Sequence, residues 1–219
     1  MIIRYIHIIL IVCASVLPTW GQKGSSVQVM ERFRAKMEEH AAFEVGFTLS
    51  GADEKGNAME SITGMIYSQK GDYAMLNPQV ELYVCGDTKW LYTVDNNEAV
   101  VMRNDPASVD LAENPLALFS AQLSKEYKIS ARPNYFRQDG QEITEISLSP
   151  ADKKTPYSSV LLRIHSQTLT PHSVKYCAKD GSWVEAVMKN FTPKRDSFPR
   201  ERFIFFQKDH PGVYMTDLR

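Results

Sequence analysis

Cysteine is scarce in this chain of 219 residues, which has three. Cys13 lies in an apolar N-terminal run, so Cys85 and Cys177 are the two that could form a disulfide bond. One disulfide and two separate buried thiols stay equally open, because the distance between the two side chains cannot be read from the sequence.

Catalytic signatures are absent as well. The chain has no Gly-x-Ser-x-Gly elbow, no Walker loop, no His-Glu-x-x-His, no Cys-x-x-Cys and no dinucleotide fingerprint. His165 and His172 are close in sequence on neighbouring expected strands, but no third donor follows at a useful spacing, so solvated strand histidines are the favoured interpretation. We expect no enzyme activity, no cofactor and no metal site.

An excess of either charge is also missing. The chain has 25 Lys and Arg against 26 Asp and Glu, interspersed along the sequence, with a formal net charge of −1. This balance argues against nucleic acid, or an anionic membrane surface, as the main partner.

The one long apolar run lies at the N-terminus, where Arg4 precedes residues 6–17 and small residues surround Gly21. The run is short for a membrane span, which needs roughly 20 apolar residues. We therefore expect residues 1–21 to be a cleaved secretory signal and residues 22–219 to form a single exported, periplasmic domain. Val12 before Cys13, in the middle of the run, argues against a lipid anchor.

Two segments have a helical apolar period. After a possible cap at Ser25-Ser26, apolar residues recur at helical spacing over about fifteen residues, at Val27, Met30, Phe33 and Met37. A second helix is expected from Asn114-Pro115, with an apolar side formed by Leu116, Leu118, Phe119 and Leu123.

Elsewhere the apolar period is two, with turn residues every eight to twelve positions. This pattern predicts an antiparallel meander of about ten or eleven strands, in the α+β class. The segments with strand patterning, from which about ten or eleven strands are expected, are residues 43–49, 61–69, 72–76, 79–85, 89–94, 98–103, 127–132, 135–139, 142–149, 158–165, 171–178, 183–191 and 202–206. The last of them contains Phe203, Phe205 and Phe206, before Pro211-Gly212.

These strands contain more aromatic and methionine side chains than two helices obviously cover. Core packing explains any one of them, but together they indicate a deformable apolar cavity. The candidate cavity residues on the strands are Phe47, Met65, Tyr67, Met75, Leu82, Val84, Trp90, Tyr92, Trp183, Phe203 and Phe205.

Several motifs resemble those of the periplasmic outer-membrane lipoprotein carrier family, the LolA-like proteins. The segments that resemble family motifs, in their order and spacing, are residues 64–70, 86–92 and 114–119, and the ending Phe203-x-Phe205, Pro211-Gly212-Val213 and Asp217. The resemblance covers nearly the whole chain after residue 21.

The resemblance implies an incomplete, strongly curved antiparallel barrel roofed by two to three helices. Its cavity would hold the acyl chains of lipoproteins, with Met30, Phe33 and Met37 on one roof helix and Leu116, Phe119 and Leu123 on a lid. Lys70, followed by Gly71, stands where the family commonly has Arg-Pro, a basic residue linked to lid closure and cargo transfer. The implied partners are acylated lipoproteins or lipid, an inner-membrane release complex and an outer-membrane acceptor; we expect a monomer.

Two other classes stay open. Periplasmic regulators of sigma factors share this curved-sheet domain, so a lipid- or lipoprotein-sensing regulatory or scaffold protein is the alternative. An enzyme whose site matches no known motif is the third class.

Overall fold

The computed structural model describes residues 24–104 and 127–219. These residues form one α-helix, α1 (Ser26–Glu38), thirteen strands and two 3₁₀ helices, η2 (Arg200–Phe203) and η3 (Gln207–Asp209). The strands of the first half are β1 (Ala42–Ala52), β2 (Ile62–Gln69), β3 (Asp72–Leu76), β4 (Val80–Cys85), β5 (Thr88–Thr93) and β6 (Glu98–Arg103). Those of the second half are β7 (Tyr127–Ile129), β8 (Asn134–Gln138), β9 (Gln141–Pro150), β10 (Tyr157–His165), β11 (Pro171–Ala178), β12 (Trp183–Lys194) and β13 (Tyr214–Asp217).

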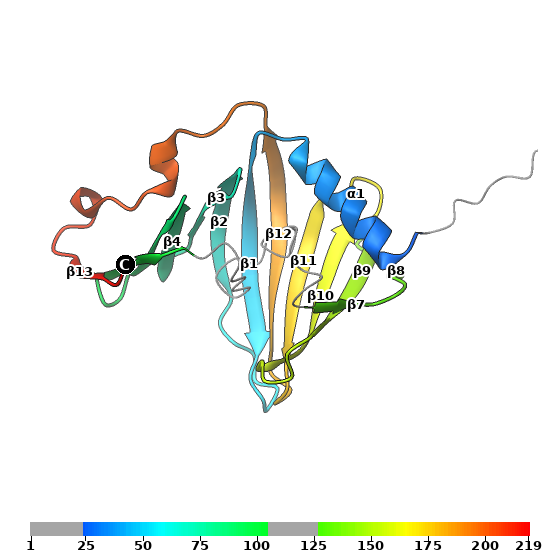
Figure 1. The fold of residues 1–219 in the computed structure, drawn as a ribbon. Coiled ribbons are helices and arrows are strands. Elements are labelled where there is room, and N and C mark those ends of the chain that lie inside the picture. Colours follow the sequence, from blue (N-terminus) through cyan, green and yellow to red (C-terminus); the bar gives the residue numbers. More distant parts are fainter. Residues whose placement is uncertain (1–23, 105–126) are drawn as a thin grey trace, which may run out of the picture.

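All thirteen strands belong to one curved, open sheet (Figure 1). Its order is β13-β6-β5-β4-β3-β2-β1-β12-β11-β10-β9-β7, with β8 paired to β9 as well. Two meanders, β1 to β6 and β9 to β12, therefore meet where β1 pairs with β12. The architecture is consistent with the expected incomplete barrel, but the described strands number thirteen rather than ten or eleven.

Helix α1 begins at the expected cap. The Ser25 hydroxyl accepts from the backbone N–H of Gln28, and the Gln28 side chain accepts from the N–H of Ser25, which forms a capping box. The helix lies across the part of the sheet that contains β8 to β11 (Figure 1). Among the described residues it is the only α-helix, so the expected two to three roof helices are not matched there; the expected helix from Asn114 lies outside the described residues.

The segment after β12 departs from the expectation of a final strand at residues 202–206. Pro199 precedes the short helix η2, and Phe203 and Phe205 are buried without joining the sheet. The last strand is instead β13, which pairs in parallel with β6. The alternation of Phe203 and Phe205 therefore indicated burial against a face of the sheet, and the strand prediction was wrong.

Tight turns connect the strands of the first meander. Gly86 and Asp87 join β4 to β5, and Gly86 has a φ of 57° while Asp87 keeps a negative φ, the pattern of a type II′ hairpin turn. The Asp72 carboxylate accepts from the Gly86 N–H at 2.8 Å and so ties this turn to β3. In the neighbouring strand end, Cys85 is buried as a free thiol, and Cys177 is also free, so the two are not bridged.

Candidate functional site

The two faces of the sheet are distinguished by strand register. Successive side chains of a strand point to opposite faces, and directly paired residues share one face. Val45 pairs with Ile66, and Ile66 with Met75, so these three side chains share a face. We call it the α1 face, because Val29 and Phe33 of α1 pack against it, and we call the other side the opposite face.

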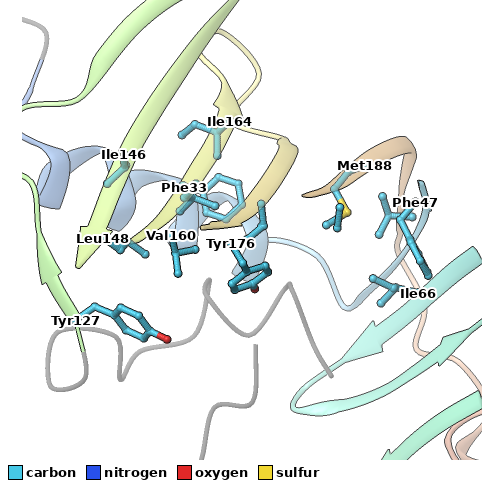
Figure 2. Packing of buried hydrophobic residues seen from close by; sticks show 14 of the residues in the cluster. Phe33, Phe47, Ile66, Tyr127, Ile146, Leu148, Val160, Ile164, Tyr176 and Met188 are labelled. Atoms are coloured by element: carbon cyan, nitrogen blue, oxygen red, sulfur yellow. The ribbon is translucent and has the colours of Figure 1, made fainter. Parts of the chain in front are cut away.

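The α1 face carries the largest apolar cluster of the described residues (Figure 2). Phe33 lies among Val160, Ile164 and Tyr176, whereas Met188, Phe47 and Ile66 lie together on β12, β1 and β2. The cluster includes residues of β2, β1, β12, β11, β10, β9 and β7, seven strands that follow one another in the sheet order. Its buried members are Val29, Phe33, Val45, Phe47, Ile66, Tyr127, Ile146, Leu148, Val160, Leu162, Ile164, Val174, Tyr176, Ala186 and Met188.

Partly exposed methionines and aromatic residues border this cluster. Phe43 and Phe191 stack at 5.4 Å between ring centroids, and Tyr157 lies 5.5 Å from Tyr176. Methionine and aromatic side chains repack at low cost around apolar ligands of varied shape. The bordering residues are Met30, Met37, Phe43, Leu49, Met75, Ile129, Tyr157, Leu169 and Phe191.

The structure divides the sequence-predicted cavity residues between the two faces. Those on α1 or on the α1 face are Met30, Phe33, Met37, Phe47, Met75, Leu82 and Val84. Those on the opposite face, or packed against it, are Met65, Tyr67, Trp90, Tyr92, Trp183, Phe203 and Phe205. A single cavity on the α1 face therefore cannot contain both groups.

The C-terminal segment covers the opposite face of the first meander. Phe203 packs with Ala74 and Cys85, while Phe205 packs with Tyr92 and Ala99. His210 lies 4.4 Å from the rings of both Phe205 and Tyr92, between ring centroids, and its Nε2 is 3.4 Å from a Glu81 oxygen. Burial, and then Glu81, raise the pKa of Tyr83, whose hydroxyl donates to Glu81. These aromatic residues form a closed core of their own.

Sequence reasoning missed the aliphatic half of the α1 face. Ile146, Leu148, Val160, Leu162 and Ile164 are at most 1% exposed and form the part of the cluster beneath Phe33. Their signal was the recurrence of aliphatic residues at every second position, Ile146 and Leu148 in β9 and Val160, Leu162 and Ile164 in β10. The emphasis on aromatic residues and methionine left them out.

Of the predicted lid and transfer residues, the structure describes the transfer residue, Lys70. The lid residues Leu116, Phe119 and Leu123 lie outside the described residues. Lys70 is exposed in the two-residue turn between β2 and β3, with a φ of 44°, and Gly71 follows with a φ of 93°. Lys70 thus lies at the end of the sheet where the C-terminal segment passes, since the Phe198 N–H donates to Gln69.

The buried members of the α1-face cluster include two titratable groups, the phenols of Tyr127 and Tyr176. An ion-pair network lies on the opposite face, where Arg163 donates to Glu145 and to Glu185, at 2.7 Å each. No group of three or more His, Cys, Asp or Glu side chains able to hold a metal ion occurs in residues 24–104 and 127–219. Within the same residues, no helix is long and apolar enough to cross a membrane.

Comparison with known proteins gives similarity of fold. No protein-family model and no curated protein matches the chain. An uncharacterized conserved protein from Thermus thermophilus matches with a TM-score of 0.57 at 9% identity, covering 88% of this chain and 98% of that one. The LolA superfamily protein NE2245 from Nitrosomonas europaea matches with a TM-score of 0.44 at 10% identity, covering 83% and 98%.

A third match is the MucA/MucB complex of Pseudomonas aeruginosa, with a TM-score of 0.41 and 13% identity over 83% of this chain and 61% of that one. At such low identity these matches concern the fold alone, and of these three the Thermus protein has a TM-score that supports it. The Nitrosomonas protein belongs to the superfamily that the sequence motifs resemble.

Proposed function

We propose that this chain is a non-catalytic carrier that binds the acyl chains of lipoproteins, or of a related lipid, against the α1 face of its sheet. The observation that carries the proposal is the continuous apolar surface across seven neighbouring strands. Seven strands about 4.8 Å apart span roughly 29 Å. Helix α1, with 13 residues, is about 20 Å long and about 10 Å wide, so it is too small to cover that surface alone.

The energetics suit a carrier. Each methylene group removed from water contributes about 0.8 kcal/mol, so an acyl chain needs an apolar surface to cross an aqueous compartment. Release of the acyl chain requires that the cover over the α1 face move away at a modest cost in free energy. Among the side chains of α1, Val29 and Phe33 are the buried apolar ones, and exposing each would cost about 1.5–3 kcal/mol. In the proposal, α1 is therefore the movable cover.

The finer parts of the proposal rest on the family resemblance. They are export to the periplasm after cleavage of residues 1–21, action as a monomer, and a lid formed by Leu116, Phe119 and Leu123. Cargo would arrive from an inner-membrane release complex and leave to an outer-membrane acceptor. Lys70, which is exposed at the rim of the sheet, would assist the handover.

A matched pair of methionines tests which face binds lipid. Met75 borders the α1 face, and Met65, on the neighbouring strand, points to the opposite face; both are partly buried. Met75→Gln places a polar group of similar size where acyl chains would lie. We expect it to weaken binding of a fluorescent fatty acid about tenfold, while Met65→Gln leaves binding within about twofold of the native protein.

The measurement is a fluorescence titration followed by displacement with unlabelled fatty acid. Thermal unfolding of each variant, measured without ligand, shows that the fold is retained. Equal effects of the two substitutions would place binding elsewhere, and no binding by the native protein would contradict the carrier proposal.

A sensing or scaffold protein is the second candidate. It is favoured by the completeness of packing beneath α1, where Ile146, Leu148 and Ile164 are fully buried. In that case the native protein would bind no fatty acid, and it would retain a protein partner through its surface.

A further inference from the structure

His165 and His172 are brought together on the opposite face by the β10–β11 hairpin. Their ring centroids lie 5.1 Å apart, and the rings are inclined at 69°. The β10–β11 register shifts between Arg163 and Ile164, so that His172 lies between the paired residues Pro171 and Ser173. The shift turns the His172 ring toward β10, which a regular ladder would not do.

The backbone of this hairpin holds the two rings in place. The His165 N–H donates to the carbonyl of Thr170 at 3.0 Å, and the Leu169 N–H donates back to the carbonyl of His165 at 2.9 Å. At the neighbouring strand, the Thr144 and Ser166 hydroxyls hydrogen-bond each other at 2.7 Å. Both histidines are therefore positioned by ordered backbone, and neither lies on a free loop.

The separation of the rings suits a shared metal ion. With Zn–N bonds of about 2.0–2.1 Å and tetrahedral angles, the centres of two liganding imidazoles lie roughly 5 Å apart. The inclination between the rings is free in such a pair, because each ring can rotate about its metal–nitrogen bond. Imidazole nitrogen is a ligand that Zn²⁺, Cu²⁺ and Ni²⁺ all accept.

Burial and several charged groups act on the two rings. Burial lowers the pKa of His165, and burial, followed by the effects of His165 and Arg163, lowers that of His172. The Glu185 and Asp139 carboxylates act on His172 in the other direction. Glu185 is already bound by Arg163 and by the Ser173 hydroxyl.

One nitrogen in the pair is uncommitted. The Nδ1 atom of His172 is buried and has no hydrogen-bond partner among the described residues. A buried polar atom without a partner is unfavourable in free energy, and a bound ligand would remove that cost.

We propose that His165 and His172 bind a zinc ion, with water in the remaining coordination positions. Because the described residues contribute two ligands and no third donor, the ion is exchangeable and not permanently held. Zinc binding links β10 to β11 beside Arg163, which donates to Glu145 and Glu185. The site lies on the face opposite to α1, so it is separate from the proposed acyl-binding surface and does not depend on it.

Calorimetric titration of untagged, chelator-treated protein with zinc chloride tests the proposal. We expect one zinc ion per chain at the hairpin and an unfolding temperature that rises with zinc concentration. His165→Ala and His172→Ala should each weaken this binding at least about tenfold, while the control His40→Ala, a histidine that packs on Phe191, should leave it unchanged. Equal zinc binding by the native protein and both hairpin variants would overturn the site.

A spectroscopic readout on the native protein covers the case in which a variant fails to fold. Copper(II) binds nitrogen sites more tightly than zinc does. Its electron paramagnetic resonance spectrum should show coupling to two nitrogen nuclei at one equivalent of copper, and zinc should displace it. A spectrum without nitrogen coupling would contradict the proposal, because it would show that the two histidine rings pack together without binding the metal.

Discussion

Lys70 has a backbone conformation that lysine rarely adopts. It has a φ of 44°, and Gly71 follows with a φ of 93°, which is the pattern of a type I′ turn between β2 and β3. Glycine adopts this conformation freely, but a lysine in the left-handed region costs roughly 1–2 kcal/mol. A charged residue that is held at such a cost is consistent with the proposed role in handover.

Replacing Lys70 with asparagine separates its charge from its backbone strain. Asparagine tolerates the left-handed conformation, and Asn-Gly is the preferred type I′ pair. We therefore expect Lys70→Asn to raise the free energy of unfolding by about 1 kcal/mol in urea titrations. The control Lys70→Arg keeps the charge and the strain, and should leave stability unchanged; a less stable Lys70→Asn would contradict the turn assignment.

The buried side of α1 was predicted only in part from the sequence. The apolar spacing predicted Val27, Met30, Phe33 and Met37 as one stripe. In the structure Phe33 is buried, and Met30 and Met37 border the cluster, whereas Val27 is 47% exposed and Val29 is buried instead. The buried side of the helix differs from the predicted one because Ser26 docks next to β7, where its hydroxyl lies 3.2 Å from that of Ser130, which is 104 residues away in sequence.

At the scale of elements, the strands of both meanders were predictable and the C-terminal segment was not. Alternation and turn residues are local signals, and they placed β1 to β6 and β9 to β12 within a few residues. Strand β13 pairs with β6 through a distant, parallel contact that no local pattern announces. The predicted cavity combined residues of both faces for a similar reason. Strand register decides which side chains of different strands share a face, and register is not a local signal.

The C-terminal segment is held to the sheet by Phe203, and Cys85 reports whether it stays there. Phe203 is fully buried against Cys85, and the Arg200 Nε lies 3.3 Å from the Cys85 sulfur. Phe203→Ala should cost about 3–5 kcal/mol of stability and expose the thiol. We expect Cys85 to react with a disulfide reagent at least about tenfold faster in this variant.

The labelling rate is measured in a background with Cys13 and Cys177 replaced by serine. Phe206→Ala is the matched control, since Phe206 is a phenylalanine of the same segment that is only partly buried. Its Cys85 should react as slowly as in the parent. Equal labelling rates in all three proteins would show that Phe203 does not hold the segment in place.

On the scale of the whole molecule, the sheet separates two apolar regions. The opposite face of the first meander is covered by the chain's own C-terminal segment, whose Phe203 and Phe205 complete a core. The α1 face extends over seven strands and is contacted by a helix that buries Val29 and Phe33. Within residues 24–104 and 127–219, the C-terminal segment covers the opposite face of the first meander, whereas one helix contacts the α1 face; this difference is the basis for placing lipid on the α1 side.

The most direct test of the carrier account is to extract purified native protein with organic solvent and identify the extract by mass spectrometry. The protein is purified without detergent, and extracted lipid is quantified against protein. The account predicts acyl-bearing material at close to one molecule per chain, and its loss in the Met75→Gln variant but not in Met65→Gln. Native protein that yields no acyl-bearing material would contradict it.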